Sequence, residues 1–490
     1  MNVKLVLGAC VLAAGFGALF AFFGGGALVY AAPLLLAVLV LADYRIAVVF
    51  LTVILQFEGS PLIPQAQGFN PITYCVLAAL ISLGLRRIYS LNELVLPPKV
   101  TIYCVVIPLF AGAFLALPHL RQGLYNFSNE AWSVNYLPGN FLKAYLLRPM
   151  ILVVYSVLIA NAIKDSRVPE RFLALTAFAA SLPAIGIVLI VAFGDYNLDD
   201  LETKRSFLGD LGMHSNGAGK LLAFIFAPVL WMTFSKRGLK RLLLGIVTIL
   251  ILTGVLLTMT RATYLAVIFV VGVFLWRRRQ MWMSIAVLAA IGLFFVFGPV
   301  AFQERVLQGM DPQTIERAST GNQNDTLTAG RTNGYVLLAP EVLKSPIWGS
   351  GTASTAWSDA VTERKFDSIH PHNLYLSAAM DIGLVGLALT IYFYLRHARM
   401  MRALEAVETI SPELRAFFAG SAVGVFGIMI FSLTNGTWFP EPDSTYMWIS
   451  YGFVYSYWYK LKRTKDPIPA AVDGKLKGHL QSDLSRRKLI

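Results

Sequence analysis

The sequence predicts an all-α fold, a polytopic bundle of about 12–14 transmembrane helices with one long, partly helical loop on the outward side. Three observations support this prediction. The 490 residues are 56% hydrophobic and only 14% charged, and the mean hydropathy is +0.62, well outside the range of soluble domains. Apolar runs that approach the roughly 20 residues needed to cross a bilayer recur from end to end. Lysine and arginine gather in alternate connections between these runs.

Fourteen apolar runs are candidate spans. The first run, Val3–Phe23 after Lys4, also resembles a signal peptide. The Gly24–Gly26 turn leads directly into another apolar run, however, which favours a retained first helix. The run at 46–57 is the shortest. The candidates are residues 3–23, 26–42, 46–57, 71–85, 100–118, 144–163, 172–193, 217–234, 242–259, 262–276, 281–302, 373–395, 416–433 and 445–459.

The distribution of basic residues predicts the orientation. With the N-terminus in the cytoplasm, the basic connections near residues 236–241, 277–279, 396–402 and 460–465 all fall on the cytoplasmic side, as the positive-inside rule requires. Both termini are then cytoplasmic. The net charge of +13 reflects anchors beside anionic membrane lipids, so no nucleic-acid partner is expected.

The spans divide the chain into four parts. Residues 1–302 hold the first eleven spans, 303–372 form a large outward loop, 373–462 hold the last three spans, and 463–490 form a polar tail predicted to be disordered. The loop is too long for a simple connection. Its polar, mobile beginning is followed, from Gly330 to Leu343, by a pattern typical of an amphipathic helix lying on the membrane.

Arg261 is the sharpest chemical signal. It lies between two apolar runs, after Thr260, with almost no loop around it. Ionisable groups at such depth are costly and usually functional. The alternative is an arginine that reaches to the lipid headgroups.

Three further arginines are candidates on the same outward side. Arg205 follows Lys204 in the loop before Asn216, and the alternative is a solvated basic pair. Arg148 lies within the sixth span, where the alternative is a buried structural ion pair. Arg331 opens the predicted loop helix and is more exposed. Because the guanidinium fork donates two parallel hydrogen bonds, a group of arginines at the lipid boundary suits a diphosphate.

Histidines supply a candidate base. His370 and His372, two of six histidines in the chain, directly precede Asn373 and the span it opens. His214 stands two residues before Asn216, at the head of another span. An imidazole with a pKa near 6.5 suits a general base that takes a proton from an alcohol, although the pair could simply decorate a loop end. With the arginines, it describes glycosyl transfer from a diphosphate-linked lipid.

Several motifs are absent. The sequence has no Asp-x-Asp, no P-loop and no dinucleotide fingerprint. His370 and His372 lack carboxylate or cysteine partners at ligand spacing, so neither a metal nor a cofactor is expected. The acidic residues at 195–210 are a rival source of the base, or a solvated loop that pairs with Arg205.

His372-Asn373, followed after nine residues by Gly383 and after two more by Gly386, resembles the motif of the O-antigen ligase and O-antigen (Wzy-type) polymerase superfamily of integral-membrane glycan transferases. The resemblance covers roughly residues 205–395. It is supported by Thr260-Arg261 opening a helix, Asn216 heading another, and Gly330-Arg331 before the 346–351 segment.

The resemblance implies a type C glycosyltransferase-like membrane fold and an inverting, metal-independent reaction. The glycan would move from undecaprenyl diphosphate to an acceptor lipid or glycan, either lipid A-core or a growing polysaccharide. The active site would face the periplasm from the bacterial inner membrane. Carried over, His372 is the base and Arg205 and Arg261 hold the diphosphate. Arg331 matches a frequent arginine without a defined role.

Further members of the predicted site are candidates by position. Arg148 would join the diphosphate-binding group, while His370, Asn373, His214 and Asn216 would support it.

Other functions stay open. The chain has more spans than the usual twelve or so of the ligases, and its 441–446 loop has no obvious counterpart, so a polymerase of repeat units for O-antigen, capsule or exopolysaccharide is the alternative to a ligase. A transporter or flippase of lipid-linked glycans would bind through the same arginines without chemistry, but should show repeats or broken helices at the midplane. A structural membrane subunit would tolerate Arg261→Lys.

Overall fold

The computed structural model describes residues 36, 38–61, 63, 70–90, 93–122, 124–126, 133–135, 137–194, 205–279, 303, 331–363, 368 and 370–464. The predicted spans 3–23 and 281–302, most of 26–42, most of the acidic residues at 195–210 and the tail from 465 lie outside these residues.

The described chain is helical apart from one short hairpin, in which β1 (Leu124–Asn126) pairs with β2 (Ser133–Asn135) in antiparallel register. The elements of the first half are α3 (Tyr44–Ile54), η1 (Leu55–Phe57), α4 (Pro71–Ser90), α5 (Lys99–Thr101), η2 (Ile102–Val106), α6 (Ile107–Ala116), η3 (Leu117–Gln122), α7 (Pro138–Leu142), η4 (Lys143–Leu147), α8 (Arg148–Lys164) and α9 (Glu170–Phe193). Those of the second half are η6 (Arg205–Leu211), α10 (Ser215–Ser235), α11 (Gly238–Leu257), α12 (Arg261–Arg278), α16 (Arg331–Lys344), η8 (Ser354–Trp357), α17 (Asp359–Thr362), α18 (Leu374–Glu405), α19 (Pro412–Phe431), η9 (Pro442–Ser444) and α20 (Thr445–Thr464).

Among the described residues, eight helices are long and apolar enough to cross a membrane, namely Pro71–Tyr89, Lys99–Leu120, Pro138–Lys164, Glu170–Phe193, Ser215–Ser235, Gly238–Leu257, Leu374–Glu405 and Pro412–Phe431. The apolar helix Tyr44–Phe57 is shorter. The other predicted spans within the described residues, 262–276 and 445–459, coincide with α12 and α20, which carry several basic residues near their ends. The predicted multi-pass helical membrane fold is confirmed.

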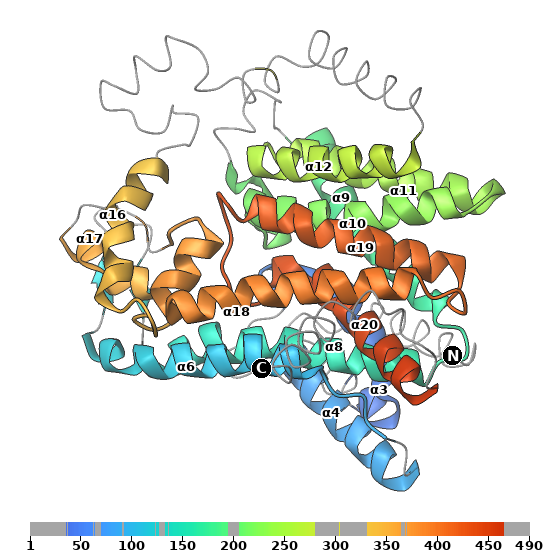
Figure 1. Cartoon of the computed structure of the whole chain (residues 1–490), viewed down its shortest axis with the longest axis horizontal. Coiled ribbons are helices and arrows are strands. Elements are labelled where there is room, and N and C mark those ends of the chain that lie inside the picture. The colour runs from blue at the N-terminus through green and yellow to red at the C-terminus, as the bar shows by residue number, and fades with distance from the viewer. Residues whose placement is uncertain are drawn as a thin grey trace, which may run out of the picture.

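The helix α10 forms the centre of the bundle. It runs beside α12 and α19 (Figure 1) and packs closely against α19 and α11. Its most apolar stretch is 83% buried, against 22% for α11. After Lys240 and Arg241 near its start, the exposed side chains of α11, such as Leu242, Ile246 and Ile249, are apolar. Lipid is the solvent that accommodates such a surface, which places α11 at the periphery and α10 inside.

Several helices begin at one end of the bundle, which we name the site end. There Thr260, directly before α12, donates to Asn216 of α10 at 3.4 Å. The amide of Leu374, the first residue of α18, donates to the Ser432 carbonyl after α19 at 3.1 Å. Loop elements α16 and α17 lie at this end (Figure 1), where the hydroxyl of Tyr335 from α16 donates to the His372 carbonyl at 3.2 Å. The segments 211–217, 258–261, 370–374 and 432–445 therefore meet.

The span predicted at 373–395 is not one continuous helix. Gly383 has φ +70° and ψ −178°, which breaks α18. A Cβ on this residue would lie 2.1 Å from the Ile347 carbonyl oxygen, so only glycine fits. The carbonyls of Met380 and Asp381 accept hydrogen bonds from the amides of Ser350 and Gly351 at 2.8 and 2.9 Å instead. The loop before α18 therefore completes the broken helix, since exposed polar backbone inside a membrane protein must find a partner.

Asp381 fixes the same loop a second time. Its buried carboxylate accepts hydrogen bonds from the amide and hydroxyl of Ser354, at 3.0 and 2.7 Å, and from the indole of Trp438, at 2.9 Å. One side chain thus joins α18, the loop before it and the segment after α19. These three pieces form a rigid support for the site end.

Candidate functional site

His372 lies at the junction of three segments. It has φ +49°, a left-handed conformation that is uncommon for residues other than glycine and that recurs at functional sites. Its Nε2 is 3.5 Å from the Ser368 hydroxyl, and the side chain of Asn435 forms a hydrogen bond with the ring. Together with the bond from Tyr335 to its carbonyl, these contacts fix the imidazole.

The surroundings of His372 keep its ring neutral. Burial and the nearby charge of Arg331, with smaller effects from His370 and His214, lower its pKa to about 4, although the bond from Asn435 acts in the opposite direction. The intrinsic value near 6.5 expected from the sequence is therefore lowered in the folded chain. A neutral imidazole is ready to accept a proton at neutral pH.

Asn373, predicted to support the site, caps α18. Its Oδ1 accepts from the amides of Tyr375 and Leu376 at 2.9 and 3.0 Å, and its Nδ2 donates to the Leu433 carbonyl at 2.9 Å. An Asx cap that also donates a hydrogen bond to the segment after α19 determines where α18 begins. Asn373 thereby determines the position of the neighbouring His372.

His214 and Asn216 occupy the start of α10. The Nδ1 of His214 accepts from the Asn216 amide at 3.2 Å, so His214 caps this helix. His214 and His370 both line one cavity. His370 keeps an exposed edge towards the cavity, while the protein around it lowers its pKa. Both influence the charge of His372, which shows that the structure brings the three histidines together.

The predicted arginines take different positions. Arg331 opens α16, and its charge reaches His372. Arg261 opens α12 directly after Thr260, which contacts Asn216. Arg205 opens η6, and its side chain lies outside the described residues. Arg148 lies 2.9 Å from the Glu58 carboxylate, the ion pair that the sequence left open, and also lines the cavity.

The site end presents helix N-termini. The helices α10, α12, α16 and α18 all begin near the histidines. Each N-terminus carries a partial positive charge and backbone amides without an intrahelical acceptor. With Arg261 and Arg331 added, the arrangement favours an anionic group such as a phosphate. Within the described ranges, no three His, Cys, Asp or Glu side chains gather as a metal site.

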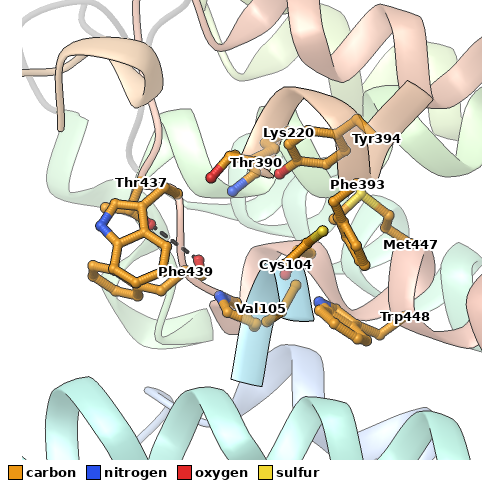
Figure 2. Close-up of a pocket in the computed structure, with 13 residues that line it drawn as sticks. Cys104, Val105, Lys220, Thr390, Phe393, Tyr394, Thr437, Phe439, Met447 and Trp448 are labelled. Carbon is orange, nitrogen blue, oxygen red and sulfur yellow. Dashed lines mark hydrogen bonds between the residues drawn. The ribbon is translucent and has the colours of Figure 1, made fainter. Parts of the chain in front are cut away.

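The sequence analysis missed Lys220. This residue lies inside α10, is 4% exposed, and pairs with Asp443 at 2.8 Å. Figure 2 shows it beside Thr390 and Tyr394, at a space of only about 10 Å³. The missed signal was a charge within the predicted span 217–234, since ionisable residues inside spans are usually functional.

A sequence model of the O-antigen ligase family matches residues 246–391, a stretch that runs from within α11 to within α18. The match includes Arg261, Arg331, His370 and His372. No curated protein matches the chain.

Proposed function

We propose that this chain, which residues 246–391 place in the O-antigen ligase/polymerase superfamily, transfers a glycan from undecaprenyl diphosphate to a sugar hydroxyl of an acceptor. The superfamily supports a glycan transferase of the ligase or polymerase type. The donor, the inverting course and the roles of individual residues are our proposal. The observation that carries it is the position of His372, which Tyr335 and Ser368 contact and which lies among helix N-termini that favour an anion.

In the proposed reaction, the acceptor hydroxyl attacks the anomeric carbon of the donor glycan. The bond from that carbon to the diphosphate oxygen breaks, and the hydroxyl proton moves to His372. The released diphosphate keeps the electron pair of the broken bond, and Arg205, Arg261 and Arg331 stabilise its growing charge. A single displacement inverts the anomeric centre. No step in this scheme requires a metal.

Binding of the donor should make His372 a stronger base. Burial and the charge of Arg331 lower the pKa of the ring. A bound diphosphate offsets that cation and adds negative charge nearby, which raises the pKa towards the range where an imidazole is an effective acceptor. Proton transfer would thus be favoured when the donor is in place.

The same proposal includes location. The helix ends opposite the site carry Arg277, Arg278, Lys236, Lys462 and Arg463, as expected for the cytoplasmic side. The active site would then face the periplasm from the inner membrane, with both termini in the cytoplasm. Labelling of a cysteine introduced at Ser345 by a membrane-impermeant reagent from outside the cytoplasm would support this. Labelling only from the cytoplasm would contradict it.

The decisive experiment uses purified protein in lipid nanodiscs with a lipid-linked glycan from the source cells. We expect release of undecaprenyl diphosphate together with a glycan joined to the acceptor. Lipid A-core and a second lipid-linked glycan, offered separately, distinguish a ligase from a polymerase. In a separate assay, the protein is reconstituted into vesicles. If it moves the glycan across the vesicle membrane without releasing diphosphate, it is a transporter and not an enzyme.

A further inference from the structure

A cavity of about 410 Å³ opens beside the histidines. This volume lies within the range of sites for small molecules. Its wall comes from the end of η1, the start of α8, the start of α10, His370, and the 439–443 segment before α20. The function proposed above uses its histidine side, whereas the side formed by residues 439–443 has no role assigned.

The polar groups of this cavity are of two kinds. Gln56 is fully engaged, because its amide nitrogen donates to the carbonyls of Val53 and Ala179 and its oxygen accepts from Tyr446. The other polar side chains that line it are the bases His214, His370 and Arg148 and the carboxylates Glu441 and Asp443. Arg148 pairs with Glu58 at 2.9 Å, and its charge also reaches Asp443. The cavity therefore offers both donors and carboxylate acceptors.

The two carboxylates belong to a rigid segment. Asp443 is 19% exposed, and its Oδ1 accepts from Lys220 at 2.8 Å. The amide of Glu441 donates to the Ser444 hydroxyl at 3.2 Å, and the Ser444 amide donates back to the Glu441 carbonyl at 2.8 Å. Burial of the Lys220 charge inside α10 is costly. Its ion pair with Asp443 orients this aspartate, which lines the cavity. Such preorganisation is typical of a binding site.

Aromatic rings complete the wall. Tyr145 and Phe439 both line the cavity, and their rings meet edge to face with centroids 5.6 Å apart. A sugar ring has hydroxyls around its edge and an apolar C–H face, so aromatic rings and carboxylates suit it together. Glu441 and Asp443 disfavour a phosphate at this wall, because like charges repel.

We propose that this cavity is a sugar subsite, in which Glu441 and Asp443 accept hydrogen bonds from sugar hydroxyls while Tyr145 and Phe439 cover the C–H face. Because His370 lines the cavity and His372 lies next to it, a sugar held here has its reacting end near the proposed base. The two carboxylates select a neutral or amino sugar and reject an acidic one. This inference rests on the proposed glycan transfer, and the sugar belongs either to the acceptor or to the donor.

The test compares three probes by equilibrium binding to the full-length protein in nanodiscs. They are undecaprenyl diphosphate without sugar, the lipid-linked glycan from the source cells, and the oligosaccharide released from it. Glu441→Gln keeps the shape of the side chain and removes its charge. We expect it to weaken binding of a sugar-bearing probe about tenfold, since hydrogen bonds to charged groups are about twice as strong as neutral ones. Binding of undecaprenyl diphosphate should not change.

Comparison of the three probes shows whether the bound sugar belongs to the donor or to the acceptor. If Glu441→Gln weakens binding of the lipid-linked glycan alone, the bound sugar belongs to the donor. If it weakens binding of the free oligosaccharide alone, the bound sugar belongs to the acceptor. Unchanged binding of both sugar probes, or equal weakening of all three probes, overturns the subsite. Glu413→Gln, at the opposite end of the bundle, is the matched control and should alter none. Binding is measured without turnover, so a wild-type protein that binds sugar but releases no diphosphate contradicts only the proposed function.

Asp443→Asn provides a second variant, in case Glu441→Gln lowers the yield of folded protein. It should weaken binding of the same sugar-bearing probe. A free oligosaccharide carrying a uronic acid offers a further check, because the wild-type protein should bind it more weakly than its neutral counterpart. Equal binding of the two oligosaccharides would overturn the predicted selectivity.

Discussion

The two ends of the bundle use charge differently. At the end opposite the site, basic residues form ion pairs between helices, as in Lys236 with Glu413 and Arg277 with Glu405, and these side chains are 20–34% exposed. At the site end, Lys220 is 4% exposed and its partner Asp443 lines a cavity. Exposed pairs contribute little to stability. The opposite end thus anchors helices, while the site end arranges charge and neutral imidazoles around space for a ligand.

The largest expected effect contrasts two histidines near opposite ends of α18. His372→Asn should lower kcat about 10²–10⁴-fold, the usual contribution of a general base. Asparagine tolerates a positive φ, so the backbone at this position need not change. The measurement is the rate of undecaprenyl diphosphate release.

His397 provides the control for that experiment. It is fully buried near the other end of α18, against Phe393 and Tyr451. His397→Gln should reduce the yield of folded protein but leave the rate per folded molecule nearly unchanged. If both variants lose the same amount of activity per folded molecule, His372 has no special role in catalysis.

The second prediction compares Lys220, inside α10, with Lys236, directly after its end. Lys220→Met leaves the largely buried carboxylate of Asp443 without its partner; loss of one member of a buried pair costs up to about 3–5 kcal/mol. Lys236→Met, just beyond the end of α10, removes an exposed pair worth about 0–1 kcal/mol. Thermal unfolding in one detergent measures both. Similar unfolding temperatures for the two variants would show that the burial of the Lys220 pair does not increase its contribution to stability.

The Lys220→Met effect should also depend on pH. Burial already raises the pKa of Asp443 to about 6, against the opposing charge of Lys220. Without that cation the value rises further, while the unfolded chain keeps a pKa of about 3.9. A group whose folded pKa is raised holds its proton more tightly when folded, so its stabilising effect is present at low pH and is lost as pH rises through the folded value. The variant should therefore be less destabilised at pH 5 than at pH 8.

Much of the fold could be predicted from local sequence. Spans such as 144–163 and 416–433 appear as apolar runs, and Arg261 stands out because it separates two of them. The break at Gly383 could not be seen, because the sequence around it is as apolar as an unbroken span. Its cause is the backbone of Ile347, which belongs to a distant loop.

The same limit applies to the site. His372 was found through its glycine spacing, but Tyr335 and Asn435, which hold it, lie far along the chain and carry no motif. Lys220 was hidden inside a predicted span, and its role became clear only when Asp443 was found beside it. Its sequence position indicates that a charge is buried but does not identify the partner. The lowered pKa of His372 likewise depends on burial that one sequence does not reveal.

The third prediction uses two arginines at the two ends of α12. Arg261→Lys removes the planar fork that suits a diphosphate. The loss of one hydrogen bond to a charged group, worth about 1.5–3 kcal/mol, should lower kcat/KM about 10–100-fold. Arg277→Lys, which is partly exposed and can still pair with Glu405, should have almost no effect. If both substitutions are harmless, Arg261 anchors a helix as Arg277 does, and the proposed diphosphate site loses a main member.

The smallest effect is a shift in one titration. Arg331 is a cation near His372 that lowers the pKa of its ring, alongside burial, His370 and His214. Removal of a positive charge favours the imidazolium, so Arg331→Gln should raise this pKa above about 4, and continued burial should keep it below about 6.5. Diethyl pyrocarbonate modifies only the neutral ring, so the pH midpoint of His372 modification, followed by mass spectrometry, reports the value. Arg402→Gln, near the opposite end of α18, should leave the midpoint in place. An unchanged midpoint in Arg331→Gln would mean that burial alone keeps His372 neutral, and that the proposed rise in basicity on donor binding cannot come from offsetting this arginine.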